Sequence, residues 1–484
     1  MTSAAVIATV LGYIAVLFAV AWVSGRRADN AGFFTGNRRT PWYMAAFAMI
    51  GAAMSGVTFI SVPGSVAADS FSYMQMVAGF TVGQLIVAFV LIPTFYRLKV
   101  VSLYEYLDDR FGVRSHRTGA WFFFVSKMLG AALRIYVVCA VMQLLVFSHY
   151  GLPFWLNAAV TMLFVWLYTQ QGGVKSLIWT DTLKTVCLVG SLVLSIVFIM
   201  QALGMSLPEM TREVAASPYS KMFFFDDPAS DRYFWKMFAA GIVLLIAMTG
   251  LDQDMMQRNL SCKNFKDSQK NMITSVISQF FVILLFLMLG VLLYIFAGSQ
   301  GIQVEKSDEL FPLIATGNYF PAVVGILFII GLISSAYSAA GSALTALTTS
   351  FTVDILGTRG RTEEEIVKIR KRVHIGMAVI MGITIFVFNL LNNTSVIDAV
   401  YILASYTYGP ILGLFAFGIF MKQQVRDKYI PLVAIVSPLL CFILQKNSEA
   451  WFNGYQFSYE LLIFNALFTF IGLCILIKKD KKNI

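Results

Sequence analysis

Long apolar runs separated by short polar segments recur along the chain from residue 4 to residue 477. Runs of about 18 or more apolar residues are long enough to cross a bilayer as helices. We predict thirteen spans, at approximately residues 4–24, 42–64, 73–96, 118–147, 154–170, 176–203, 234–255, 271–297, 321–353, 373–391, 396–421, 429–445 and 459–477. The pattern indicates an all-α polytopic membrane protein with a single membrane domain, because no Pro/Ser-rich linker divides the chain.

Two of these spans are interrupted by glycine and polar residues. The second reads AFAMIGAAMSGVTFISVPGS, and the seventh ends in IAMTGLDQDMMQRNLS. Interrupted helices at corresponding places in two repeats are the best sequence pointer to a transporter binding site. The two lie five spans apart, which fits an inverted five-plus-five repeat with halves at about residues 42–203 and 234–421. Extra helices then lie at about 4–24 and 429–477. Two ordinary kinked helices are the alternative.

The ninth span carries hydroxyl groups on one face. The serines and threonines at steps of three and four are Ser335, Ser338, Ser342, Thr345 and Thr349. Small residues on a stripe also let helices approach closely, which is the alternative reading. Hard cations prefer several oxygen ligands. Asp181, at the head of the sixth span, would supply the charge, and an unwound second span would supply carbonyls near Gly51 and Met54.

Composition supports a membrane protein and excludes other classes. The chain is 58% hydrophobic and 13% charged, with a net charge of +10. Most of its 36 lysines and arginines fall in alternate connecting segments when the N-terminus is placed outside, so the basic excess follows the positive-inside rule. Nucleic-acid binding is therefore not expected. The five cysteines show no C-x-x-C spacing and are interpreted as small buried residues.

Six segments resemble the sodium/solute symporter family, which contains bacterial sodium–galactose, proline and sialic acid transporters. In chain order they are PWYMAAFAMIGAAMSGVTFISVPG, RLKVVSLYEYLDDRFGVRS, QQGGVKSLIWTDTLK, DQDMMQRNLS, SAYSAAGSALTALTTSFTVDIL and YTYGPILGLFAFGIF. They cover nearly the whole chain, and the second and third are specific in combination. The resemblance implies a LeuT-like inverted five-plus-five repeat with extra helices, thirteen in many bacterial members.

The resemblance also implies one or two sodium sites. The first uses carbonyls at Gly51, Met54 and Ser335 and the hydroxyl of Ser338. The family usually has a second hydroxyl directly after this serine, where this chain has Ala339, so one expected ligand is missing. The second site matches Asp181 with Ser338 and Ser342. The alternative for Asp181 is a helix cap or an ion pair with Lys175 or Lys184.

Further polar residues are expected to face a solute cavity. They are Ser55, Thr58, Tyr73, Gln75, Arg134, Asp252 and Gln253. Arg134 lies in the middle of a span, where an arginine is costly unless it faces a cavity or pairs with an acid. It would either grip a substrate carboxylate or pair with Asp252 or Asp254. The first role favours an organic anion, and the second suits a neutral sugar or polyol equally well.

We therefore expect a sodium-coupled symporter that imports a small polar solute, with a sugar acid such as sialic acid or another sugar as the leading substrate. Amino acid or monocarboxylate uptake, or a proton-coupled carrier of the same fold, are the alternatives. The sequence has no Walker A loop, GxSxG elbow or HExxH pair, so an enzyme is not expected. We expect a protein of the bacterial inner membrane with an outside N-terminus and a cytoplasmic C-terminus. A monomer is the working expectation for its oligomeric state.

Overall fold

The computed structural model describes residues 2–25, 40–98, 103–169, 174–357, 361–391 and 396–478, which are almost entirely helical. No strand forms within these ranges; two isolated β-bridges join Thr40 to Cys262 and Val425 to Ile477. Eight helices are long and apolar enough to cross a membrane, two bent helix pairs form further candidate spans, and three shorter apolar helices accompany them. Each of the thirteen predicted spans coincides with one of these features, so the predicted fold class is confirmed.

The spans have the following bounds in chain order. They are α1 (Ser3–Gly25), α3 (Trp42–Ala53) with α4 (Gly56–Gly64), α6 (Tyr73–Ile86) with η2 (Val87–Leu91) and α7 (Ile92–Leu98), α9 (Val113–Met142), α10 (Phe154–Thr169), α11 (Val174–Ala202), α13 (Phe234–Leu245) with η6 (Ile246–Gly250) and α14 (Gln253–Leu260), α15 (Phe265–Gln300), α17 (Ala322–Ser350), α18 (Glu363–Leu391), α19 (Val396–Phe420), α20 (Ile430–Lys446) and α22 (Leu461–Ile475). Short helices connect them: α5 (Val66–Asp69), α8 (Glu105–Arg110), α12 (Leu207–Ala216), α16 (Leu310–Thr316) and α21 (Ser448–Trp451). Shorter turns are η3 (Gln143–Phe147), η4 (Ser148–Tyr150), η5 (Pro218–Ser220), η7 (Ser307–Glu309), η8 (Phe351–Ile355) and η9 (Asp427–Tyr429).

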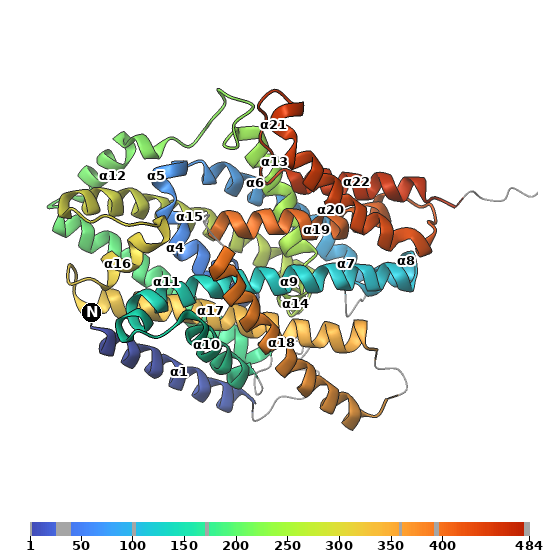
Figure 1. Cartoon of the computed structure of the whole chain (residues 1–484), viewed down its shortest axis with the longest axis horizontal. Helices are drawn as coiled ribbons and strands as arrows, with labels where there is room; N and C mark the ends of the chain where they lie inside the picture. Colours follow the sequence, from blue (N-terminus) through green and yellow to red (C-terminus); the bar gives the residue numbers. More distant parts are fainter. Residues whose placement is uncertain are drawn as a thin grey trace, which may run out of the picture.

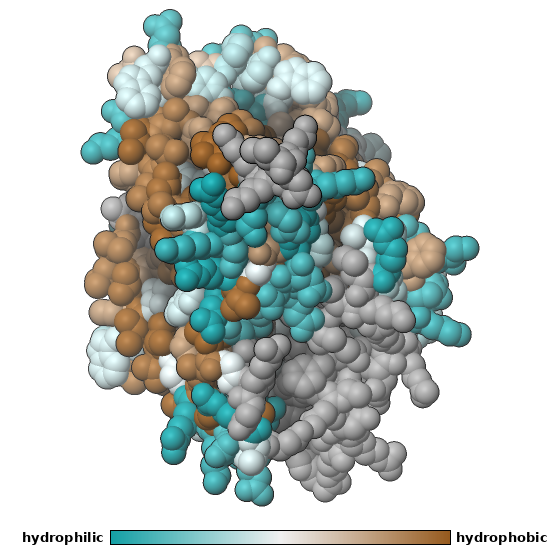
Figure 2. Space-filling model, turned by 90° about the vertical axis from the view of Figure 1, so that its right-hand side faces the viewer, coloured by the Kyte–Doolittle hydropathy of each residue, from teal (hydrophilic) through white to brown (hydrophobic). Residues whose placement is uncertain are grey.

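Four of the long helices share a common direction. Figure 1 shows α9, α15, α17 and α19 running along the long axis of the molecule, with α12 and α16 at one end and α8 at the other. Figure 2 faces the end that carries α8, where hydrophilic side chains gather toward the centre and hydrophobic side chains cover one flank. This distribution is the one expected of a helical bundle whose sides contact lipid and whose ends contact water.

Both predicted helix interruptions are present. The axes of α3 and α4 meet at 55°, and those of the α13–η6 helix and α14 meet at 71°. In the first break, no backbone amide of the described chain donates to the carbonyls of Gly51 through Met54. In the second, Asp252 caps α14 by accepting hydrogen bonds from the amides of Asp254 and Met255. Each break therefore presents polar groups inside the bundle.

Close packing of α3 against α11 positions the first helix break next to Asp181. A Cβ on Gly51 would lie 2.4 Å from the Thr185 Oγ1 and 2.8 Å from the Asp181 carbonyl oxygen, so only glycine fits without a shift. Further along α11, a Cβ on Gly331 of α17 would lie 3.3 Å from the Leu188 Cα. Helix α11 thus packs closely against both α3 and α17, and Asp181 lies near both helices.

Candidate ion and solute site

Asp181 lies in the interior of the bundle. It is 0% exposed and sits seven residues after the start of α11, so it does not cap this helix. Its Oδ1 accepts a hydrogen bond from the Ser338 hydroxyl, and its Oδ2 lies 3.7 Å from the Arg258 Nη2 without accepting a hydrogen bond. No ion pair with Lys184 forms, and the side chain of Lys175 lies outside the described residues. The predicted alternative of a capping residue or a partner of Lys184 is therefore wrong.

The hydroxyl face of α17 divides between two acids. The Ser338 hydroxyl points to Asp181, whereas the Ser342 hydroxyl donates to the Asp254 Oδ2 at 3.1 Å. One turn before Ser338, the buried Ser335 Oγ has no hydrogen-bond partner and would lie 3.7 Å from a Cβ on Gly56, at the start of α4. Asp181, Ser335 and Ser338, three residues predicted to supply ligands, thus lie near the first helix break, while Ser342 lies against another carboxylate.

The groups at this break suit an alkali cation. They comprise one carboxylate oxygen without a hydrogen bond, one unpartnered buried hydroxyl, and the free carbonyls of the Gly51–Met54 turn. A buried oxygen without a partner is costly, since its desolvation is not compensated. Coordination of a hard cation by such oxygens would compensate this cost. No group of three His, Cys, Asp or Glu side chains that could hold a metal occurs among the described residues, so a cation at this break would need hydroxyl or carbonyl oxygens in addition to the carboxylate.

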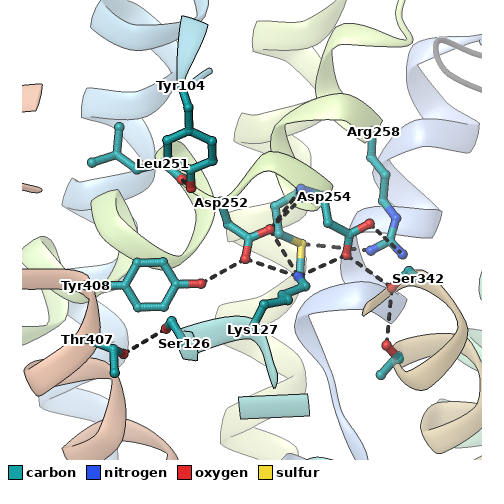
Figure 3. A network of polar contacts seen from close by, with 12 residues as sticks. Tyr104, Ser126, Lys127, Leu251, Asp252, Asp254, Arg258, Ser342, Thr407 and Tyr408 are labelled. Carbon is teal, nitrogen blue, oxygen red and sulfur yellow. Dashed lines mark hydrogen bonds and ion pairs between the residues drawn. The ribbon is translucent and has the colours of Figure 1, made fainter. Parts of the chain in front are cut away.

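The second break carries a network of charged and polar side chains (Figure 3). The Lys127 Nζ of α9 lies 3.1 Å from both carboxylate oxygens of Asp252 and 3.2 Å from the Asp254 Oδ2. The Tyr408 hydroxyl of α19 donates to Asp252 at 2.9 Å, and the Arg258 Nη2 lies 3.8 Å from the Asp254 Oδ1. The two carboxylates are therefore matched by a lysine and an arginine in the same buried cluster.

Arg134 lies between two small cavities. It lines one of about 40 Å³ next to this network and another of about 90 Å³ beside the first helix break. Within the described part of the chain, its guanidinium makes no hydrogen bond or ion pair. Asp252 and Asp254, its predicted alternative partners, are paired with Lys127 instead. Arg134 is thus a partly buried cation that faces open space.

The first cavity is also electropositive. Its charged lining side chains are Lys127, Arg134, Lys184, Arg258, Asp252 and Asp254. Lys184 is 1% exposed and, like Arg134, has no hydrogen bond or ion pair among the described residues. Unpaired buried cations strongly favour the arrival of an anion. Both cavities are smaller than the roughly 300–1,000 Å³ of typical small-molecule sites, so a solute needs the surrounding helices to move apart.

Some of the other predicted solute contacts line a cavity and some do not. Ser55 and Thr58 line the larger cavity together with Tyr401, to which Tyr73 is hydrogen-bonded at 2.7 Å. Gln75 is fully buried outside both cavities: its amide donates to the Arg232 carbonyl and the Met237 Sδ and accepts from the Phe224 amide.

Gln253 is likewise away from both cavities, because its Oε1 accepts a hydrogen bond from the Leu103 amide. For Gln75 and Gln253 the prediction of a cavity contact does not agree with the structure, since their amides bind backbone groups of loops.

Sequence reasoning missed three charged residues of the site. From the sequence, Lys127 had no assigned role, Lys184 was only an alternative partner of Asp181, and Arg258 lay within the DQDMMQRNLS motif without a role. These residues could have been found in the sequence because an ionisable residue within a membrane span usually marks a functional or paired site. Arg258 also follows Asp254 by one helical turn, which is the spacing of an intrahelical ion pair.

Comparison with known proteins decides the family. The model of the sodium:solute symporter family matches residues 33–427. The chain belongs to this family. Its relatives include the human sodium/iodide cotransporter, which is 25% identical over 83% of this chain. The match spans 63% of the cotransporter's own length. This family is one of transporters, as the sequence predicted.

Bacterial symporters match over more of their length. The sodium/sialic acid symporter SiaT of Proteus mirabilis is 25% identical over 86% of this chain and 84% of its own, and NanT of Aliivibrio fischeri is 24% identical over 91% and 88%. The solved structure of a Na⁺-coupled sialic acid symporter in a substrate-bound outward-open state superposes with a TM-score of 0.82 at 21% identity, covering 97% of each chain. The fold of this sodium:solute symporter is thereby the one predicted.

Proposed function

We propose that this symporter imports a small carboxylated solute, a sugar acid of the sialic acid class, together with sodium by alternating access. The observation that carries the proposal is Arg134, an unpaired guanidinium between two cavities in the middle of the bundle. A guanidinium binds a carboxylate through two parallel hydrogen bonds. The names of the bacterial relatives SiaT and NanT support a sialic acid.

Sodium would bind at the first helix break. The Gly51 and Met54 carbonyls, the Ser335 carbonyl and the Ser338 hydroxyl would hold one ion. Asp181, with Ser338 and Ser342, would hold a second. The Asp181 Oδ2 without a hydrogen bond supports this role, whereas the bond of Ser342 to Asp254 makes Ser342 the weakest member of the set.

Coupling follows from shared elements. The α3–α4 break carries the proposed sodium ligands, and Ser55 and Thr58, one and four residues beyond Met54, line the solute cavity. Sodium that fixes this break also positions the cavity wall, so each ligand raises the affinity for the other. Couplings of this kind typically change affinity by a factor of roughly 5–150.

We further propose a bacterial inner-membrane protein with its N-terminus outside and its C-terminus in the cytoplasm. The alternation of basic segments supports this orientation. A single chain supplies every residue of the proposed site, which supports a monomer as the transport unit.

Uptake by the purified protein in liposomes tests the proposal. Radiolabelled N-acetylneuraminate, galactose and lactate are each offered with an inward sodium gradient or with choline in place of sodium at fixed pH. We expect sodium-dependent accumulation of N-acetylneuraminate in preference to the other two. A preference for galactose would contradict the role of Arg134. A preference for lactate would mean that the substrate is a small monocarboxylate and not a sugar acid. Equal uptake in choline would contradict sodium coupling.

Arg134→Gln sharpens the same experiment. Loss of charged hydrogen bonds worth about 1.5–3 kcal/mol raises the half-saturating solute concentration roughly 10–150-fold. Arg212→Gln, an exposed arginine on α12, is the matched control and leaves this concentration unchanged. An unchanged half-saturating concentration in Arg134→Gln would contradict the proposal that Arg134 binds the carboxylate of the solute.

A further inference from the structure

An apolar groove runs along the outer face of the molecule between α10 and α18. It has a volume of about 570 Å³ and only hydrophobic or glycine lining, including Trp166, Met162, Ile375, Gly382 and Phe386. Gly382 forms part of its floor, where an added Cβ would be in ordinary contact, 3.6 Å from the Met162 Cγ. The absence of a side chain at this position leaves the middle of the groove open.

The two helices are antiparallel and joined at one end of the groove. Thr169, the last residue of α10, is hydrogen-bonded at 2.9 Å to the His374 Nε2 of α18, and the His374 Nδ1 is 3.0 Å from the Thr348 hydroxyl. From Ile375 next to this junction to Phe386, the groove follows eleven residue steps of α18, or about 16 Å. This is close to half of the roughly 30 Å hydrocarbon core, the depth of one leaflet.

Two basic side chains continue the groove beyond its closed end. Lys371 and Arg372 precede Ile375 by four and three residues and therefore lie on the same face of α18. Both are exposed, and within the described residues neither makes a hydrogen bond or ion pair. Of the acidic side chains described near the start of this helix, Glu364 and Glu365 lie almost two turns further from the groove. An apolar slot one leaflet deep thus ends in two unpaired positive charges.

We propose that this groove binds an anionic phospholipid, with an acyl chain between α10 and α18 and the phosphate on Lys371 and Arg372. The occupant follows from the complementarity of both parts: the slot excludes polar ligands, and the charged end favours an anionic headgroup over a zwitterionic one. Each basic side chain near an anionic lipid surface contributes roughly a five-fold preference. The two together predict an anionic preference of at least about ten-fold.

Native mass spectrometry of the detergent-purified full chain measures this preference. Dioleoyl phosphatidylglycerol and dioleoyl phosphatidylcholine are titrated separately, so that only the headgroup differs. We expect tighter binding of the anionic lipid by at least about ten-fold, and loss of most of this difference in Lys371→Gln/Arg372→Gln. The double variant Lys263→Gln/Lys266→Gln removes two other exposed charges and should keep the preference. Equal binding of both lipids by the wild-type protein, or a preference that survives in Lys371→Gln/Arg372→Gln, would overturn the proposal.

Filling the groove tests the acyl chain separately. Gly382→Leu, or Ala159→Leu from the opposite wall, should weaken binding of both lipids about ten-fold. Gly12→Leu on α1, where an added side chain meets open space, is the control and should change neither. Unchanged lipid binding in both filled variants would overturn the proposal. So would a wild-type dimer that Gly382→Leu converts to a monomer, because the groove would then hold a second copy of the chain.

Discussion

The two helix breaks of this transporter hold their acids in different ways. At the α14 break, Asp252 is saturated by Lys127, Tyr408 and two backbone amides. Beside the α3–α4 break, Asp181 has a single hydrogen bond among the described residues, from Ser338, and its Oδ2 has only the Arg258 guanidinium at 3.7 Å. A saturated carboxylate has no capacity left for a mobile ligand, whereas a half-satisfied one does. The comparison indicates that the first acid holds helices together, and it supports the proposal that the second binds an ion.

The same distinction applies to the cations. Lys127 is bound between two carboxylates, while Arg134, a further two turns along α9, has no partner within the described residues. One helix thus carries a paired cation and the cation that we propose to bind the solute. Their roles should separate experimentally, because a structural charge governs stability and a binding charge governs affinity.

The largest expected effect is on stability at the saturated break. Lys127→Met leaves two buried carboxylates with too little positive charge, and removal of one partner of a buried ion pair typically costs about 3–5 kcal/mol. We expect a large fall in the thermal unfolding midpoint of the purified protein and a low level in membranes. Lys221→Met, which removes an exposed ion pair with Asp226, costs less than about 1 kcal/mol. Equal midpoints in the two variants would contradict the structural role of Lys127.

A smaller effect is expected from Tyr408→Phe. The variant removes a hydrogen bond from a phenol to a charged acceptor, worth about 1.5 kcal/mol, while Lys127 still neutralises Asp252. The unfolding midpoint should fall by less than in Lys127→Met, with sodium affinity unchanged. Tyr429→Phe on the exposed η9 turn is the control and should leave the midpoint as it is. A change in sodium affinity in Tyr408→Phe would mean that the two breaks are not separate.

The smallest effect on stability is expected at Ser335. Because its hydroxyl has no hydrogen-bond partner among the described residues, Ser335→Ala should change the free energy of unfolding by less than about 0.5 kcal/mol in sodium-free buffer. The comparison variant Ser338→Ala removes a hydrogen bond to a buried carboxylate and should cost more, about 1.5 kcal/mol. A larger loss of stability in Ser335→Ala than in Ser338→Ala would contradict the environments described for the two hydroxyls.

The sequence predicted the helices and their breaks well, because hydrophobic length and glycine content act locally. It also placed Asp181 beside Ser338, although 157 residues separate them, through the resemblance to a family. It did not predict that Lys127 rather than Arg134 pairs with the acids of the α14 break. Both cations lie on α9, and only the packed structure decides which one reaches Asp252.

The two glutamines expected in the cavity show a second limit. Gln75 and Gln253 are polar residues within or next to apolar segments, which is also the pattern of a solute contact. In the structure their amides bind backbone groups of Phe224 and Leu103. A polar residue that fixes a loop and one that binds a solute look alike in sequence, because the difference depends on tertiary contacts.

The central claim is that the half-satisfied Asp181 helps to bind sodium, and sodium-induced thermal stabilisation tests it most directly. The unfolding midpoint is followed as sodium replaces choline at constant ionic strength, without solute, since a ligand of the native state raises stability with its concentration. For Asp181→Asn we predict a half-effective sodium concentration at least about ten-fold above that of the wild-type protein. Ser191→Ala, a buried hydroxyl ten residues further along α11, should respond as the wild type does. A wild-type sodium response in Asp181→Asn would contradict the account.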